Sequence, residues 1–351
     1  MTGARTAAAI LGCGLLLSAA SAGPARETER TPVATTPHFA LYSDFDTNLN
    51  DALIAVGVAR KFRRPELFRS GDEAACFDKL PLSVRTAWEG TADYYAKVIS
   101  PAEWNGRPQY LVRVQLAGFD NEWSDPDARQ FVEIVRSFRA AASPAYEACH
   151  WAAQDEKNRR WIEDLKSRLA SDGKKIAARV EQLYQKRWKG LPIPVDVVET
   201  VNWAGANSIL RGHAGGHILV STEYQGPAAL EVVFHEASHI LMDVGDPVRK
   251  ALDKAARAAE FPLPGDLWHA VLFYTTGEAV RRILDDGGET GYTPMVYAMF
   301  DRGTWGSYRS ALERSWRPYL DGQRTLHEAS TGLIETLKSP VKPQAGADAP
   351  K

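Results

Sequence analysis

The spacing of apolar residues along the chain changes between a period near two and a period of three to four. Four short stretches alternate or stay apolar over five to eight residues and predict strands: 38–42, 109–116, 195–201 and 217–221. Apolar residues recur at three and four in most of the remaining chain, which predicts helices at 44–62, 126–188, 228–244, 247–259, 266–286, 305–319 and 325–337. We expect a helix-dominated α+β fold, with helix breaks at Ser143-Pro144 and Asp172-Gly173.

Shifts in composition divide the chain into segments of different character. The predicted segments are a signal peptide at 1–22, a flexible leader at 23–37, a mixed and then helical region at 38–190, a second region at 191–338 and a disordered tail at 339–351. The two large regions are expected to belong to one unit.

The N-terminal segment has the three parts of an export signal. Arg5 precedes an apolar run from Ala7 to Leu17, and Ala20-Ser21-Ala22 offers a small-residue cleavage site. Because the run is too short to span a bilayer, we expect cleavage after Ala22 and a periplasmic or secreted protein without an integral membrane span. A lipid anchor on Cys13 is the alternative.

Charge and cysteine content limit the partners and the compartment. The 351 residues carry 42 basic and 44 acidic side chains, a formal net charge of -2, so no excess of positive charge is available for nucleic acid. Export would leave two cysteines, Cys76 and Cys149. They either form one disulfide in an oxidising compartment or remain two separate buried thiols.

Residues 235–239 read His-Glu-Ala-Ser-His, the pattern H-E-x-x-H. On a helix the imidazoles of His235 and His239 project from one face and can reach one metal ion. Glu236 lies beside them and can take a proton from a metal-bound water. The apolar residues of this segment lie on the opposite face of the helix, so the core does not need the two histidines for packing.

Residues 217–245 resemble the active-site helix, with its preceding strand, of the zincin metallopeptidases. The metzincin branch requires glycine and histidine where this chain has Met242 and Gly245, which excludes it. The gluzincin branch takes its third ligand from a later helix, and Glu278 is the residue that this resemblance implies. It further implies Zn²⁺ as the cofactor, a zincin-like core with a small sheet against the motif helix, and a 217–221 strand that holds substrate as the sheet edge.

Two other residues of the predicted 266–286 helix are candidates for the site. His269 is an alternative third ligand, but nine residues separate it from Glu278, which is half a turn and about 13 Å on a straight helix, so the two cannot bind one ion together. Tyr274 lies one turn before Glu278 and can donate to a developing oxyanion if Glu278 binds metal. In the alternative interpretation, Tyr274 only packs in the core and His269 is only an imidazole at the N-terminus of the helix.

The function implied by the resemblance is an exported zinc metallopeptidase that acts on peptide or protein substrates. A metal-activated water would attack the scissile carbonyl, with Glu236 as general base. Two alternatives stay open: a non-catalytic zinc-binding scaffold with a peptidase-like fold, and a periplasmic glycan-binding protein in which the motif is accidental.

Overall fold

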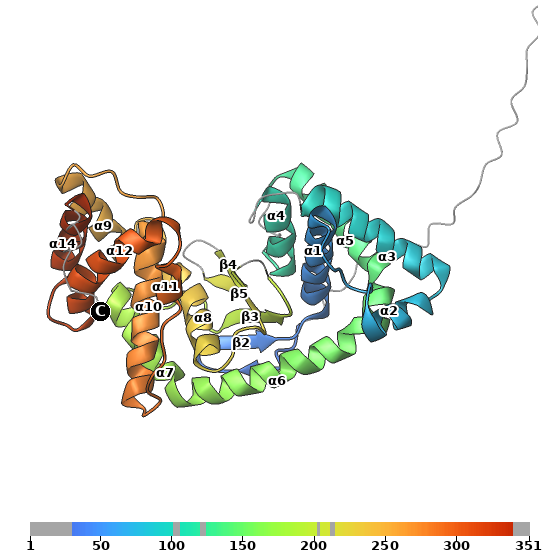
Figure 1. Ribbon diagram of the computed structural model, residues 1–351, viewed down its shortest axis with the longest axis horizontal. Coiled ribbons are helices and arrows are strands. Elements are labelled where there is room, and N and C mark those ends of the chain that lie inside the picture. Colours follow the sequence, from blue (N-terminus) through green and yellow to red (C-terminus); the bar gives the residue numbers. More distant parts are fainter. Residues whose placement is uncertain (1–29, 101–105, 120–123, 202–203, 211–214, 340–351) are drawn as a thin grey trace, which may run out of the picture. The chain divides into compact units, whose positions relative to one another are not determined.

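A mixed five-stranded sheet lies among the helices of the computed structural model (Figure 1). The structure describes residues 30–100, 106–119, 124–201, 204–210 and 215–339. The predicted signal peptide with Cys13, residues 23–29 of the leader and all but the first residue of the tail lie outside the described residues. From Pro32 onward the described chain forms one compact unit. No helix within the described ranges is both long enough and apolar enough to cross a bilayer.

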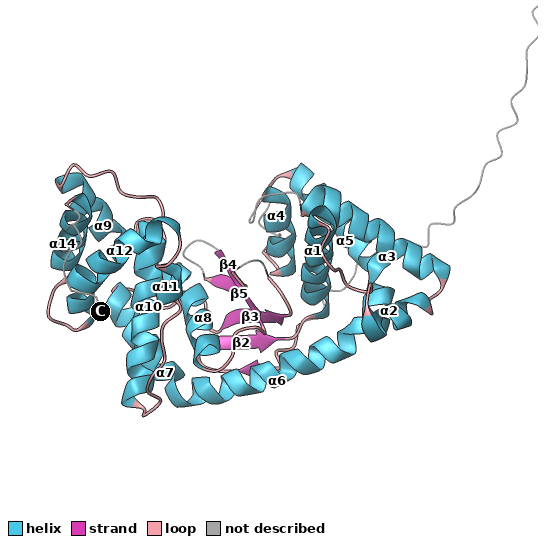
Figure 2. Ribbon diagram, in the orientation of Figure 1, coloured by secondary structure: helices cyan, strands magenta, loops and turns pink. Residues whose placement is uncertain are grey.

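The strands run in the order β1-β2-β3-β5-β4 (Figure 2). Their bounds are β1 Ala34–Thr35, β2 Phe39–Tyr42, β3 Ile193–Val198, β4 Ala206–Leu210 and β5 Gly216–Ser221. β2, β3 and β5 are parallel, and the two outer strands pair antiparallel to their neighbours. The central strands β3 and β5 are covered on both faces, which explains their nearly continuous apolar sequence. The helix-dominated α+β class is therefore confirmed, as are the strands expected near 38–42, 195–201 and 217–221.

The two faces of the sheet pack against different partners. Val195, Ile218 and Val220 belong to the main hydrophobic core, which also contains Phe234 of the motif helix. Leu219 points to the opposite face and joins a small cluster with Val114. The motif helix therefore rests on one side of the sheet, and the N-terminal helices approach the other.

The N-terminal helices have a hydrophobic core of their own, which includes Trp88, Tyr95 and Tyr146. These helices are α1 Phe45–Phe62, α2 Gly71–Asp78, α3 Leu82–Tyr94, α4 Arg107–Leu116 and α5 Pro126–Tyr146. Arg113 of α4 connects them to the sheet region, because its guanidinium lies 3.3 Å from both Asp51 of α1 and the carbonyl of Val201. Arg113 and Asp51 are each only 2% exposed. A buried pair of this kind is costly to break, because either partner alone would be an unpaired charge.

Residues 109–116 form helix α4, so the predicted strand is wrong. The buried residues of α4 are Gln109, Val112, Arg113 and Val114, whereas Tyr110 is 47% exposed. Burial at 109, 112 and 113 follows helical spacing, and Pro108 stands in the first turn, where its missing N–H costs nothing. The alternation of apolar and polar letters was misleading because the polar Arg113 is an inward-facing residue held by Asp51.

The predicted helix breaks at 143–144 and 172–173 are also wrong. Helical backbone continues from Pro126 to Tyr184 through α5, α6 Ala152–Arg168 and α7 Lys174–Tyr184. Two π-helical turns, Glu147–Trp151 and Leu169–Gly173, join these helices. Such turns accommodate an extra residue without ending the helix. In Figure 1, α6 runs beneath the sheet from the N-terminal helices toward α7.

The described residues after β5 form helices and connecting loops, without a further strand. The α-helices are α8 Pro227–Ser238, α9 Pro247–Ala258, α10 Leu267–Asp286, α11 Val296–Met299, α12 Gly306–Ala311, α13 Arg317–Leu320 and α14 Leu326–Lys338. The predicted helices at 228–244, 247–259, 266–286 and 325–337 are therefore present, although α8 ends earlier than expected. In the 305–319 segment the helix is assembled from α12, a π-helical turn and α13.

Cys76 of α2 and Cys149 of the first π-helical turn form a disulfide, with their Cα atoms 5.7 Å apart. Beside it, His150 places Nδ1 2.6 Å from Glu73 and Nε2 3.1 Å from Glu199. Burial alone would lower the pKa of His150, but hydrogen bonds to Glu199 and Glu73 outweigh it and raise the pKa. When it is protonated, the imidazole donates to both carboxylates and so joins α2 to the end of β3.

Replacing both cysteines with serine is expected to lower the free energy of unfolding by about 4 kcal/mol, because the cross-link closes a loop across a separation of 73 residues. Denaturant unfolding followed by circular dichroism measures the difference. Reductant should shift the wild-type midpoint and leave the double variant unchanged. Equal midpoints for oxidised wild type and variant would contradict the prediction.

His150→Gln is expected to be most destabilising at acidic pH. The folded-state pKa of His150 is raised, so its contribution is complete below the unfolded-state pKa of about 6.5 and is lost as pH rises through the folded value. Because Glu73 and Glu199 are 39% and 43% exposed, the loss should not exceed about 1 kcal/mol. Unfolding curves of both proteins at pH 6 and pH 8.5 should therefore diverge only at the lower pH.

Candidate metal centre

The motif lies on α8, a helix buried along nearly its whole length. Gly226, with a φ of 57°, precedes Pro227 at the first helical position. Leu230, Phe234 and Ala237 pack into the main core. The α-helix ends at Ser238, and His239 opens a 3₁₀ turn to Leu241.

The early end of α8 is stabilised by two charged residues from other segments. The Lys186 ammonium donates to the carbonyl of Ile240 and to the carboxylate of Asp246, both at 2.6 Å. The same carboxylate accepts from the backbone N–H of Asp243 at 2.9 Å. These contacts fix the turn that carries His239.

Three imidazoles converge between α8 and α10. The ring centres of His235, His239 and His269 form a nearly equilateral triangle, with sides of 5.2, 5.4 and 5.2 Å. The Nε2 atoms of His235 and His269 are 3.4 Å apart. One nitrogen from each ring lies within 4.8 Å of the other two, close enough for the three side chains to bind one metal ion.

Burial keeps these imidazoles neutral. It lowers the pKa of His235 far below the usual value, that of His239 to about 3 and that of His269 to about 4. A charge on one ring would also repel a charge on its neighbours, which lowers the pKa values of His235 and His239 further. At His269 the negative charge of Asp266 raises the pKa and offsets part of the lowering by burial. Neutral imidazole is the form that binds metal, so no proton has to be displaced at neutral pH.

Glu236 is placed between the motif helix and the sheet. Its side chain is 7% exposed, and the Ser208 side chain of β4 lies near it. Burial raises the pKa of Glu236 to about 7, and the contact with Ser208 offsets a part of that rise. A carboxyl group with a pKa near neutrality can both accept and release a proton at physiological pH.

The outermost strand beside this site is β4, so the expectation that 217–221 forms the sheet edge is wrong. β5 lies between β3 and β4, with Ile218 opposite both Val195 and Ser208. β4, at Ala206–Leu210, was not predicted from the sequence. Ser-Ile-Leu at 208–210 is its only strand-like signal.

Glu278 does not join the histidines. Its carboxylate lies 2.9 Å from the guanidinium of Arg281 and accepts a hydrogen bond of 2.9 Å from the Tyr297 hydroxyl. Burial alone would raise the pKa of Glu278, but Arg281, Tyr297 and Arg282 together lower it. Glu278 and His269 are half a turn apart on α10, so their side chains point in different directions. The structure therefore favours His269 as the third metal-binding residue.

Tyr274 also lies away from the histidines. Its hydroxyl accepts from the Nε of Arg317 at 3.0 Å, and the side chain is fully buried. The oxyanion role considered for Tyr274 required Glu278 as a ligand, so the geometry gives it no support. Gly277 permits a close contact between α10 and α8, because a Cβ there would lie 2.9 Å from Glu231 of α8.

Aromatic side chains that the sequence analysis did not single out surround the three histidines. The Phe273 ring centre is 3.6 Å from that of His235. Trp268 lies 5.6 Å from His239 and 5.1 Å from His269, and Trp305 lies 5.6 Å from His269. Trp305 is fixed by Asp266, the residue before α10, whose carboxylate accepts from the indole N–H at 2.9 Å.

The acidic residues one turn either side of the motif do not orient the imidazoles. Glu231 accepts from the Tyr292 hydroxyl at 2.6 Å and from the backbone N–H of Met295. Asp243 accepts from the backbone N–H of Val244. The Nδ1 of His235 is buried without a hydrogen-bond partner, so this ring is positioned by packing against Phe273.

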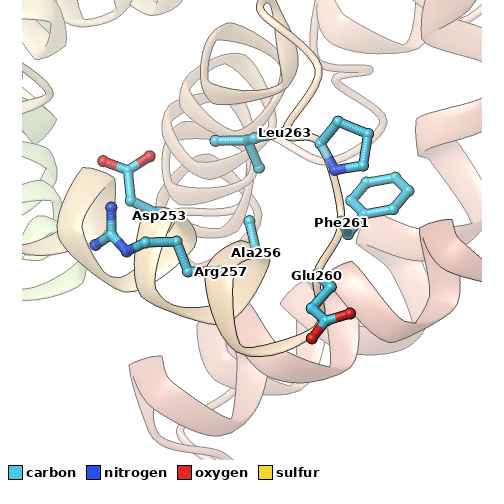
Figure 3. Close-up of a pocket in the computed structure, with 7 residues that line it drawn as sticks. Asp253, Ala256, Arg257, Glu260, Phe261 and Leu263 are labelled. Atoms are coloured by element: carbon cyan, nitrogen blue, oxygen red, sulfur yellow. The ribbon is translucent and has the colours of Figure 1, made fainter.

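Two cavities of about 370 Å³ lie elsewhere in the described structure. One is lined by Glu278, Arg281, Tyr297 and Arg317 together with residues 292–294. The other lies between α9 and the segment that follows it, where Ala256, Phe261 and Leu263 are among the lining residues (Figure 3). Neither is lined by the three histidines.

Comparisons with known proteins give no relative. No protein-family model matches the chain, and neither a curated protein nor a solved structure matches it significantly. The candidate site is therefore argued from its own geometry.

His269→Ala is expected to weaken zinc binding by more than about 100-fold, because loss of a residue that merely supports a ligand already costs 10–100-fold. Glu278→Gln, on the same helix, should retain close to one zinc ion per chain. Metal analysis after dialysis against a zinc buffer gives both values. Retention of zinc by the His269 variant together with its loss from the Glu278 variant would reverse the assignment.

Proposed function

We propose that this protein is an exported zinc-dependent hydrolase, most simply a metallopeptidase of the zincin type. The observation that carries the proposal is the placement of Glu236 beside three converging imidazoles and against the outermost strand of the sheet. A helix with this motif on a mixed sheet whose outer strand is antiparallel supports the resemblance of residues 217–245 to zincins.

The three histidines fit a zinc ion. In a tetrahedral site with zinc–nitrogen bonds of about 2.0–2.1 Å, two ligand nitrogens lie about 3.3–3.4 Å apart. The Nε2 atoms of His235 and His269 are 3.4 Å apart, and all three rings are neutral. Three protein ligands leave one coordination position for water, as catalytic zinc sites do. The third ligand in this proposal is a histidine, which departs from the gluzincin pattern.

When bound, zinc would supply a Lewis acid that polarises the scissile carbonyl and acidifies water. Glu236 would accept the proton of the attacking water and deliver it to the leaving amine. The rings of Trp268, Phe273 and Trp305 pack against the imidazoles and cover part of their surface, which strengthens electrostatic interactions there.

A peptide would bind in an extended conformation beside β4. Outer strands of sheets accept peptides by main-chain pairing. Ser208 of this strand contacts Glu236, so a peptide alongside β4 would pass the general base. This arrangement transfers the substrate-holding role from β5, where the sequence analysis placed it, to β4.

The disulfide supports export. A bond between Cys76 and Cys149 forms and persists in an oxidising compartment. This agrees with the predicted signal peptide at 1–22, with cleavage after Ala22, and with a periplasmic or secreted location.

Glu236→Gln is expected to lower peptide hydrolysis by at least about 100-fold while zinc content stays near one per chain, because the amide cannot accept the proton. Cleavage of a peptide library followed by mass spectrometry, with metal analysis of the same samples, provides the test. Glu223→Gln, in the exposed turn before α8, is the control and should keep full activity.

Undiminished turnover by the Glu236 variant would rule out this mechanism. A wild-type protein that binds zinc and cleaves no peptide in the library would instead identify the non-catalytic zinc-binding scaffold.

A further inference from the structure

Arg249, near the histidines, has no acidic partner. It lies in the first turn of α9, and its guanidinium carbon is 4.8 Å from the centre of the Trp268 ring. No carboxylate among the described residues lies within 4 Å of it. Asp246, one turn earlier, is engaged by Lys186 at 2.6 Å, and Asp253, one turn later, makes no ion pair with it.

Among the half-buried arginines of the described residues, only Arg85 likewise has neither a carboxylate nor a hydrogen-bond acceptor. Arg60, 15% exposed, contacts three carboxylates, and Arg281, 31% exposed, contacts two. The Nε of Arg249 is buried without a hydrogen-bond partner, whereas its two terminal nitrogens are not buried. A cation in the first turn of a helix also opposes the helix dipole, so helix stability does not account for it.

Trp268 connects Arg249 to the proposed zinc site. The indole contacts the rings of His239 and His269 at 5.6 and 5.1 Å. The guanidinium carbon is therefore no more than about 10 Å from the centre of the His269 ring. An extended peptide advances about 3.3 Å per residue, so a group two or three residues from the scissile bond can reach Arg249.

We propose that Arg249 binds a carboxylate of the substrate and that the enzyme prefers peptides with an anionic group two or three residues from the cleaved bond. This inference rests on the proposed function. A carboxylate would pair with the two exposed terminal nitrogens of the guanidinium in a charge-assisted, bidentate contact. Trp268 holds the cation through its ring face and limits the directions it can take. The carboxylate can belong to the peptide C-terminus or to an Asp or Glu side chain.

The test uses matched peptides built around a sequence that the wild-type protein cleaves. One pair differs only in a C-terminal carboxylate or amide, and a second pair carries Glu or Gln at the second or third position from the cleaved bond. We expect Arg249→Gln to raise KM about tenfold for the anionic member of one pair and to leave the neutral member and kcat unchanged. The pair that responds identifies the source of the carboxylate.

Two variants control for charge and fold. Arg257→Gln removes an equal charge from the exposed side of α9 and should leave both pairs unaffected. Arg249→Lys keeps the charge without the planar fork and should have an intermediate effect. Equal losses on anionic and neutral peptides, or the same shift in the Arg257 variant, would overturn the proposal.

Calorimetry on the Glu236→Gln protein separates this inference from the proposed function. Zinc-loaded Glu236→Gln should bind the anionic peptide about tenfold more tightly than its neutral match, and adding Arg249→Gln should abolish the difference. Equal or absent binding of the two peptides overturns the role of Arg249 even if the wild-type protein is a peptidase. If the calorimetric preference is present without cleavage by the wild type, Arg249 is supported and the peptidase assignment fails.

Discussion

The close crossing of α10 over α8 is the contact on which the candidate site depends. Gly277 leaves room for Glu231, and the Thr276 hydroxyl donates to that of Ser238 at 3.0 Å inside the core. The Tyr184 hydroxyl of α7 lies 3.0 Å from the same Thr276 and extends this buried chain to a third helix. Such fully buried hydroxyl contacts specify how two helices register, because a shift would leave them unpaired. It is this register that brings His269 to His235 and His239.

Burial has opposite consequences for the acid and the bases of the site. It lowers the pKa values of the imidazoles and raises that of Glu236 to about 7. The same lack of water therefore prepares neutral nitrogen ligands and a carboxyl group poised for proton transfer. The surrounding aromatic rings maintain these conditions. The same burial leaves the Nδ1 of His235 without a hydrogen-bond partner.

The N-terminal helices contribute through the opposite face of the sheet. Arg113 lies near Asn207 of β4 and is neutralised by Asp51, whose pKa burial raises to about 6 even against the attraction of that arginine. Asn207 and Ser208 are adjacent in β4 and face opposite sides of the sheet. The strand that contacts Glu236 is thus supported from behind by α1 and α4.

The sequence by itself determined the elements whose apolar period is clear, the pair of histidines one turn apart, Glu236 between them and the two cysteines able to pair. These features depend on residues close together in the sequence or on the number of cysteines. They can therefore be recognised without knowing which segments of the chain are in contact. Only the tertiary structure showed that His269, and not Glu278, lies beside the two histidines, because both residues are on one helix and the crossing with α8 determines which face of it meets them. It also made 109–116 a helix, since a buried Arg113 is favourable only with Asp51 opposite, and it made β4 the outer strand. These features depend on contacts between residues that are distant in the sequence. A local pattern of apolar and polar residues does not predict them.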